Sequence, residues 1–227
     1  MASEALIKLW QAAGVRATAG DLELRWIDDD LLVDLAELAG RGVHDPEAMP
    51  FYTPWTRGTP DQVARSVLKY QWSIRQNVGP KLTLEFAVLV GGVVVGSQGA
   101  SGTQWTVLRS VETGSWLGRE FQGRGIGTRM RVLMLHLLFD GLGAHDVTSG
   151  AFADNAASNA VSRKVGYEED GITRMAREGT AAVANRFRIT REKWDAVREA
   201  NFALLGATPT LDGVEALRAQ LEAPSGT

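Results

Sequence analysis

A glycine-rich turn between a strand-like segment and an apolar helix is the feature that most constrains this chain. Its sequence is Gln122-Gly123-Arg124-Gly125-Ile126-Gly127, preceded by an alternating segment over 106–117 and followed by apolar side chains at helical spacing over 128–139. Glycine lets the backbone turn tightly and approach a ligand closely. A helix that opens directly behind the turn adds unpaired amide donors and the positive end of its dipole. The turn therefore predicts an anion site that suits a pyrophosphate, with further positive charge from Arg124, Arg129 and Arg131.

A second motif lies downstream of the turn. Asn155-Ala156-Ala157-Ser158-Asn159 opens a short helix, which ends at Lys164-Val165-Gly166-Tyr167. Together with Ser115-Trp116-Leu117 and the glycine turn, this pattern resembles the GNAT superfamily of acyl-CoA-dependent N-acyltransferases. Within that superfamily it is most similar to the RimJ/RimL type, which acetylates protein N-terminal amines and includes relatives that act on small amines. The resemblance covers residues 20–195, and it departs from the family at Ser115, where an aromatic residue often stands.

The resemblance implies a mixed α/β fold in which two central strands splay apart and the co-substrate enters the gap. Here those strands are the segments 106–117 and 146–152. The order of elements agrees, because antiparallel strands followed by alternating helices and strands predict a mixed sheet with helices on both faces. We expect three parts: an N-terminal extension (1–20), a GNAT acyltransferase domain (21–195) and a C-terminal helical extension (196–227).

Local patterns predict the remaining elements. Further strands are expected over 22–26, 82–90, 93–98, 167–175 and 184–190, with Gly91-Gly92 as a hairpin turn. Further helices are expected over 5–12, 31–38, 61–76, 194–205 and 214–221. Residues 41–60 are rich in proline and predict an irregular segment, and residues 223–227 are expected to be disordered.

Composition narrows the functional classes. The net charge of −3 argues against a nucleic-acid-binding surface, and the lack of cysteine excludes disulfides and thiolate chemistry. His44, His136 and His145 show no metal-ligand spacing, so no metal is expected. No apolar run approaches about 18 residues, and residues 1–20 lack the features of a signal peptide. We therefore expect a cytoplasmic enzyme with no membrane segment.

The glycine turn and its neighbours are expected to bind acetyl-CoA or another acyl-CoA. The end of the strand offers backbone groups to the pantetheine amides, and the Leu117 N–H is the expected oxyanion donor. Asn155 caps its helix and, as the resemblance implies, hydrogen-bonds the pantetheine arm. Arg163 either contacts a CoA phosphate or lies on a solvated helix face. The expected co-substrate contacts are Trp116, Leu117, Gly118, Gln122, Gly123, Arg124, Gly125, Ile126, Gly127, Thr128, Asn155, Ser158 and Arg163.

Glu112 is the candidate general base. A strand places Glu112 on the same face as Gly114 and Trp116, where desolvation is expected to raise the pKa of its carboxyl. The alternative is a solvated carboxylate paired with an arginine such as Arg109. Glu85, on the neighbouring strand, is the reserve candidate, and Ser158 is the candidate proton donor to the leaving thiolate. Tyr167 is interpreted as core packing.

The acceptor site is expected in the proline-rich segment, where specificity commonly lies on loops. The candidate substrate contacts are His44, Phe51, Tyr52 and Trp55, together with Glu85. The alternative is an aromatic-packed connector. A peptide N-terminus and a small amine both remain open as acceptors, and a succinyl or longer group replaces acetyl if the slot end is roomy or carries a cation. The C-terminal extension is expected either to close over the active site or to form a homodimer interface.

Two other functions compete with acyl transfer. A dinucleotide-binding oxidoreductase needs its third glycine one residue later than Gly127, and the expected acidic residue about 20 positions on is missing. The other alternative is a non-catalytic, acyl-CoA-binding sensor or scaffold. Loss of the acid at position 112 would favour this alternative, but Glu112 is present.

Overall fold

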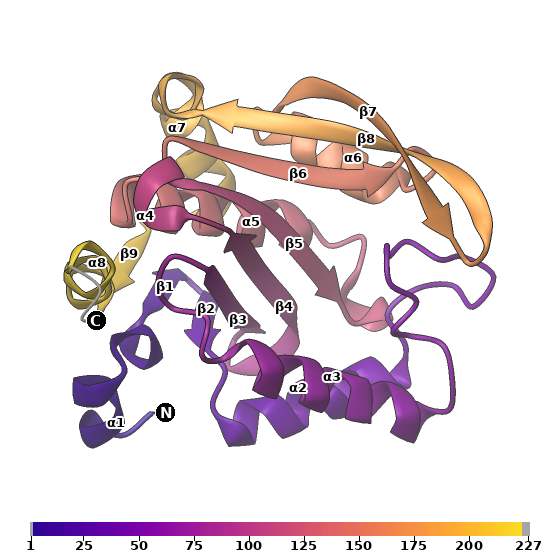
Figure 1. The fold of residues 1–227 in the computed structure, drawn as a ribbon, viewed down its shortest axis with the longest axis horizontal. Coiled ribbons are helices and arrows are strands. Elements are labelled where there is room, and N and C mark those ends of the chain that lie inside the picture. Colours follow the sequence, from indigo (N-terminus) through magenta and orange to yellow (C-terminus); the bar gives the residue numbers. More distant parts are fainter. Residues whose placement is uncertain (1, 224–227) are drawn as a thin grey trace.

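The computed structural model describes residues 2–223, and its centre is one nine-stranded mixed sheet with helices on both faces (Figure 1). The expectation of disorder for residues 224–227 lies outside the described residues. The sheet order is β7-β8-β6-β5-β4-β3-β2-β1-β9. The strands are β1 (Arg16–Ala19), β2 (Leu22–Trp26), β3 (Leu82–Val90), β4 (Val93–Gly102), β5 (Ser110–Leu117), β6 (Asp146–Phe152), β7 (Glu168–Arg177), β8 (Thr180–Thr190) and β9 (Thr210–Asp212).

The helices begin where the sequence supplies caps. Asp28 accepts a hydrogen bond from the Leu31 N–H at the start of one helix, and Thr59 forms a capping box with Gln62 at the start of the next. The helices are α1 (Glu4–Leu9), α2 (Asp29–Arg41), α3 (Pro60–Ile74), α4 (Trp105–Leu108), α5 (Ile126–His136), α6 (Ala156–Lys164), α7 (Arg191–Leu205) and α8 (Val214–Glu222). A π-helical turn, Leu137–Gly141, extends α5.

A separate hydrophobic core covers each face of the sheet. On one face, α2 and α3 pack with Ala87 and Leu89 of β3 (Figure 1). On the other face, α5 packs against Leu84 and Phe86, the residues that alternate with them. Every residue of 130–135 is buried, so α5 lies at the centre of the larger core.

The strand predicted over 106–117 begins later than expected. Trp105 to Leu108 form the short helix α4, and Arg109 takes a left-handed conformation (φ 50°) before β5 starts at Ser110. The cause is Trp105, which is fully buried and donates its backbone N–H to the Pro80 carbonyl. Anchoring this side chain fixes a helical turn at this point. Val107 and Leu108 are both exposed in that turn, although their place in the alternating sequence pattern predicted a strand.

Two short strands were not predicted. β1 pairs antiparallel with β2, and β9 pairs antiparallel with β1, with Arg16 opposite Asp212. Residues from the expected N- and C-terminal extensions therefore share one edge of the sheet. The C-terminal helices predicted over 194–205 and 214–221 are confirmed as α7 and α8.

The predicted divergence of the two central strands is confirmed. β5 and β6 are parallel, and their pairing runs only from Ser110↔Asp146 to Thr113↔Ser149. Beyond Thr113 the rest of β5 pairs only with β4, while β6 continues along β8. A gap between two parallel strands therefore opens in the middle of the sheet.

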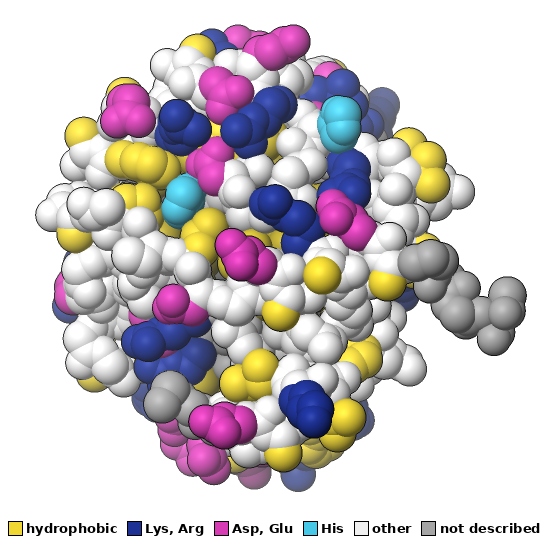
Figure 2. Space-filling view, turned by 90° about the vertical axis from the view of Figure 1, so that its left-hand side faces the viewer, with side chains coloured by type: hydrophobic (Ala, Val, Ile, Leu, Met, Phe, Trp, Pro, Cys, Tyr) yellow, Lys and Arg dark blue, Asp and Glu magenta, His cyan; other side chains and the backbone are white. Residues whose placement is uncertain are grey.

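The face drawn in Figure 2 carries charged side chains of both signs. Figure 2 shows basic and acidic side chains interspersed over the face that carries α8, with neither sign gathered in one patch. Within residues 2–223, no helix has both the length and the apolar character needed to cross a bilayer.

Candidate functional site

A cleft of about 950 Å³ occupies the gap between β5 and β6. The glycine turn and the start of α6 line this cleft. Residues 43–44 and 47–52 also line it, together with Arg177 and Glu178 at the tip of the β7–β8 hairpin. A volume of this size accommodates a large organic co-substrate together with a small acceptor.

The glycine turn has the geometry of an anion cradle. Gly123 and Gly125 have φ values of +72° and +77°, and no atom lies within 4 Å of where a side chain would begin. α5 starts at Ile126 without a side-chain cap, and its first backbone bond within the helix runs from the Arg129 N–H to the Gly125 carbonyl. The amides of the first turn therefore point to open space, as pyrophosphate binding requires.

Most of the predicted co-substrate residues lie together in the cleft. Those that line it are Trp116, Leu117, Gln122, Gly123, Gly125, Gly127, Thr128, Asn155 and Ser158. Gly118 and Ile126 are buried and do not line it. Arg163 pairs with Glu169 on the surface, which is the solvated alternative considered for it.

The positive charge expected around the turn is distributed differently. Arg129 forms an ion pair with Asp21 in the β1–β2 turn, so its charge is compensated there. Arg131 points into the sheet. Arg124 is exposed and lies over the Phe121 ring, 5.9 Å from its centroid. The prediction that all three arginines support the turn is therefore wrong for Arg129 and Arg131, because a helix directs successive residues to different sides.

The free edge of β5 faces the gap. The Gly118 N–H donates to the Val95 carbonyl of β4 at 2.9 Å. Because backbone groups alternate in direction along an antiparallel pair, the Leu117 N–H points away from β4 and toward the gap. The Leu117 carbonyl accepts a hydrogen bond from the Gln122 side chain at 3.0 Å, which ties the glycine turn to the strand end.

Asn155 and Ser158 hold the start of α6 beside the cleft. The Asn155 side chain accepts a hydrogen bond from the Ser158 N–H at 3.1 Å, which confirms the predicted cap. Ser158 also lines the cleft, so its hydroxyl stays a candidate proton donor. Tyr167 is buried, with its hydroxyl 3.0 Å from the Thr113 hydroxyl, and this confirms the core-packing interpretation.

Glu112 lines the cleft but is exposed, so the predicted desolvation of its carboxylate is wrong. The expected cover is missing because Leu108 belongs to α4 and the neighbouring Gly114 has no side chain. The alternative pairing with Arg109 is also not found, since Arg109 bonds the Leu142 carbonyl and Glu222.

Tyr52 and Glu112 approach each other over Gly150. A side chain at Gly150 would collide with the Tyr52 hydroxyl, and its Cβ would lie 3.4 Å from Glu112 Oε1. Burial, and next the negative charge of Glu112, raises the pKa of the Tyr52 phenol. Tyr52 is therefore a neutral hydrogen-bond donor close to the candidate base.

The aromatic segment combines the two roles considered for it. His44, Phe51 and Tyr52 line the cleft. Trp55 does not line it, and instead packs against Phe51 and Trp116 with ring centroids 5.0 Å and 5.7 Å apart. The segment thus presents some side chains to the cleft and uses Trp55 as a connector.

Two ion pairs join the tip of the β7–β8 hairpin to the other walls of the cleft. Arg57 donates to both carboxylate oxygens of Glu178, at 2.7 and 2.9 Å. Arg177 pairs with Asp154 at 2.8 Å. Figure 1 shows the hairpin tip beside the loop between α2 and α3. These contacts join the walls of the cleft at the hairpin tip.

Arg131 is a site residue that the sequence analysis assigned to the glycine turn, whereas the structure places its guanidinium against the diverging strands. It lines the cleft, although only 3% of it is exposed. Its guanidinium donates to Ser115 on β5, to Ser149 on β6 and to Gln98 on β4, at 3.1, 3.1 and 3.3 Å. Among the described residues, no carboxylate forms an ion pair with Arg131, so its positive charge has no ionic partner at the point where the strands diverge. The available signal was an arginine inside the otherwise apolar run 130–135.

Glu85 does not line the cleft, but it is a half-buried carboxylate on the face of α2 and α3. Ser97 donates to its Oε2 at 2.8 Å, and Tyr70 donates to its Oε1 at 3.3 Å. Burial raises the pKa of Glu85 to about 7, against the opposing effect of these two hydrogen bonds. A group that titrates near neutrality is thus present one strand away from the cleft.

Comparison with known proteins gives a consistent result. The acetyltransferase (GNAT) domain family matches residues 21–168. A GCN5-related N-acetyltransferase from Brucella melitensis is similar in structure, with a TM-score of 0.65 and 19% identity over 90% of this chain and 94% of that one. Mycobacterium smegmatis RimJ, solved in complex with CoA-disulfide, has a TM-score of 0.64 and 19% identity over 86% of this chain and 93% of that one. A ribosomal-protein-S5-alanine acetyltransferase from Vibrio fischeri has a TM-score of 0.60 and 17% identity over 78% of this chain and 97% of that one.

Proposed function

We propose that this chain, which belongs to the GNAT acetyltransferase family, moves an acyl group from an acyl-CoA to a primary amine by direct attack. The observation that carries the proposal is the cleft at the β5–β6 gap, which joins an anion cradle at one end to an acidic, aromatic acceptor end. A cytoplasmic location accompanies the proposal, because the co-substrate is an acyl-CoA.

Each step of the transfer has a residue suited to it. Glu112 accepts the proton that the attacking amine loses, and the nearby Tyr52 hydroxyl is placed to orient that carboxylate or the amine. The Leu117 N–H donates to the carbonyl oxygen as negative charge develops there. The Ser158 hydroxyl supplies the proton that the departing sulfur takes up. No covalent intermediate on the protein is required.

Arg131 favours a second possibility for the acyl group. A co-substrate that starts at the glycine turn and follows the free edge of β5 ends where pairing resumes, at Thr113 and Ser149. The uncompensated guanidinium of Arg131 lies at this point, bonded to Ser149. A fixed buried cation suits an acyl chain with a terminal carboxylate, so succinyl is a candidate beside acetyl.

The deciding experiment is free-thiol release from acetyl-CoA and succinyl-CoA against a mixed panel of amines. The panel contains ribosomal-type peptides, polyamines, aminoglycosides and amino acids. Turnover confined to peptides with an N-terminal Ala or Ser supports a peptide acceptor, and turnover confined to small amines supports the other class. Binding of acyl-CoA without thiol release for any acceptor would favour a sensor or scaffold.

A substitution in the glycine turn tests co-substrate binding. Gly125→Asp adds bulk and negative charge at a position with positive φ, where the pyrophosphate must approach. We expect calorimetry to show that binding of acetyl-CoA and CoA is abolished while the fold is retained. Undiminished binding would place the co-substrate elsewhere.

Removing the candidate base tests the chemistry. Glu112→Gln is expected to lower the acyl-transfer rate by about 10²–10⁴ near neutral pH and to leave acyl-CoA affinity nearly unchanged. Measured rates from pH 6 to 9 distinguish the roles. Equal turnover of the variant and the wild type over this range would show that Glu112 takes no proton.

A further inference from the structure

Three glycines lie in one line across the sheet, and Glu85 stands at the end of that line. Glu85 on β3 is paired with Gly99 on β4, and Gly99 is paired with Gly114 on β5. Glu112 is paired with Thr148 on β6, so Gly114 and Gly150 face each other two residues further along, across the gap. All of these positions lie on the face covered by α2 and α3, because partners in a sheet share a face.

The space above this line is filled at both ends and open in the middle. A side chain at Gly99 would collide with the Glu85 carboxylate, and one at Gly150 would collide with the Tyr52 hydroxyl. At Gly114 no atom lies within 4 Å of the place where a side chain would begin. Gly114 and Gly150 both line the cleft, so this open space belongs to it. The Glu85 carboxylate is therefore one strand spacing, about 5 Å, from the floor of the cleft.

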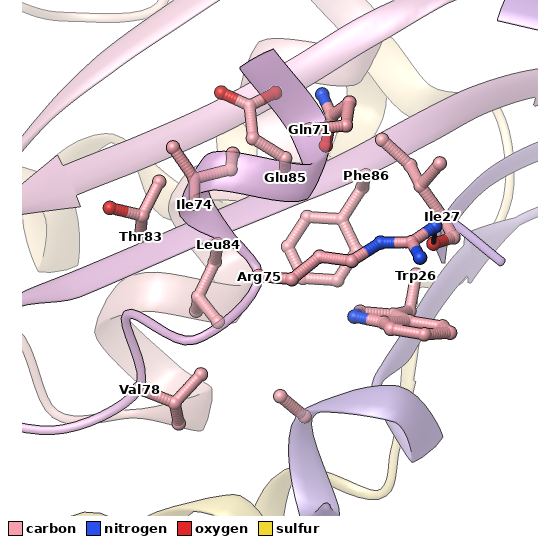
Figure 3. Close-up of a pocket in the computed structure, with 11 residues that line it drawn as sticks. Trp26, Ile27, Gln71, Ile74, Arg75, Val78, Thr83, Leu84, Glu85 and Phe86 are labelled. Atoms are coloured by element: carbon pink, nitrogen blue, oxygen red, sulfur yellow. Dashed lines mark hydrogen bonds between the residues drawn. The ribbon is translucent and has the colours of Figure 1, made fainter. Parts of the chain in front are cut away.

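Glu85 has hydrogen-bond donors but no cation. Its carboxylate accepts bonds from the Ser97 and Tyr70 hydroxyls, and no lysine, arginine or histidine among residues 2–223 forms a salt bridge with it. Figure 3 shows the Arg75 guanidinium extending away from Glu85 toward Trp26. An enclosed carboxylate in this position takes up a proton or completes an ion pair with a bound cation.

Other acidic groups make the acceptor end attractive to cations. Glu47 and Glu112 line the cleft, and within the described part of the chain neither has a salt-bridge partner. Asp154 and Glu178 also line it, but Arg177 and Arg57 neutralise them. A cationic acceptor thus meets uncompensated negative charge at the cleft and again at Glu85.

Resting on the proposed function, we propose that Glu85 is the distal anchor of the acceptor site, where it binds the second ammonium group of a short α,ω-diamine. The reacting amine then lies over Gly114 in the gap, beside Glu112, and the carbon chain crosses the bare glycine floor toward Gly99. The span from Gly99 to the middle of the gap is about 7 Å, one and a half strand spacings, which sets the length of the diamine. Trp116, opposite Ser97 in the register, forms the apolar wall of this path.

The test compares amines that differ only at the far end. Thiol release from acetyl-CoA and succinyl-CoA is measured with putrescine, with butylamine and with 4-aminobutyrate. The wild type is expected to use putrescine more efficiently than butylamine by about 10- to 100-fold in kcat/KM, and to use 4-aminobutyrate least. Glu85→Gln is expected to remove the preference for putrescine while turnover of butylamine is retained. Glu37→Gln, on the exposed side of α2, is the matched control and keeps the preference.

The outcomes separate this inference from the proposed function. Equal use of putrescine and butylamine by the wild type, or a preference that survives Glu85→Gln, overturns the inference and leaves acyl transfer in place. Turnover with peptides alone does the same. If no acceptor gives thiol release, the proposed function fails, and calorimetry of putrescine and butylamine on the CoA-saturated wild type still decides the role of Glu85. Tighter binding of putrescine supports the anchor, and equal binding overturns it.

Discussion

Two charges without a charged partner lie on opposite faces of the same sheet, and consecutive residues of β4 hold them. Gln98 accepts from Arg131 on the α5 face, and Ser97 donates to Glu85 on the α2–α3 face. Arg131 is fixed by hydrogen bonds to side chains of three strands, whereas Glu85 has two hydroxyl partners. A guanidinium stays charged in proteins, but a carboxyl group whose pKa lies near 7 can take up a proton and become neutral at neutral pH.

Under the proposed function, this difference would let one sheet serve two substrates of opposite charge. A permanent cation under the gap suits a negative group on the co-substrate. A carboxylate that is neutralised when empty suits a positive group on the acceptor, and it avoids the full cost of an unpaired enclosed charge. The following predictions test this distinction, beginning with the largest expected effect.

Arg131→Met should have the largest effect. We expect kcat/KM with succinyl-CoA to fall by about 10²–10³, because a terminal carboxylate would lose its buried partner. The loss with acetyl-CoA should be smaller. Arg131→Lys, which keeps the charge but cannot make all three hydrogen bonds, is the control and should lie between. An equal loss with both acyl-CoAs would mean that Arg131 only maintains the splayed strands.

Glu85→Gln should change how stability depends on pH. The pKa of Glu85 in the folded state, about 7, lies above its ordinary value of 4.5. The folded state therefore holds the proton more tightly, and the wild type loses stability as the pH rises from about 4.5 to 7. The glutamine variant avoids this loss and should be the more stable protein above pH 7, by at most about 3 kcal/mol.

Thermal unfolding of both proteins from pH 4 to 8 checks this prediction. The two melting temperatures should approach each other at the acid end and separate as the pH rises. Parallel curves over the whole range would show that Glu85 titrates in its ordinary range, and would end the distinction drawn between the two charges.

Ser115→Ala should have the smallest effect. It removes one of the three hydrogen bonds to Arg131 and leaves those to Ser149 and Gln98. We expect a loss of about 1 kcal/mol, seen as a several-fold fall in kcat/KM with succinyl-CoA. An effect as large as that of Arg131→Met would show that the guanidinium depends on every partner for its position.

Local chemistry made part of this site predictable from sequence. The glycine turn needs positive φ at Gly123 and Gly125, and Asn155 caps α6, the helix that begins at the next residue. Both features are therefore determined by neighbouring residues. The hairpin at Gly91-Gly92 and the extent of β6 were predictable for the same reason. The mixed sheet then followed from the order of these elements.

The remaining features depend on contacts between distant segments. The exposure of Glu112 depends on Leu108 leaving the strand, and that is decided by the burial of Trp105. The line of glycines exists only through the register of four strands, which no single segment specifies. Arg131 carried a signal that periodicity alone misassigned, because every residue of 130–135 is buried and a charged residue inside that run had to be functional or paired.

The pairing of β9 with β1 has a consequence for how the chain is synthesised. β1 lies near the start of the chain, and its outer partner consists of residues 210–212. During translation β1 can pair with β2 as soon as both emerge, but its other side remains an open strand edge until residues 210–212 have left the ribosome. Among the nine strands of the described sheet, the one made last therefore covers an edge of the one made first, and the emergence of residues 210–212 is the step that completes this sheet.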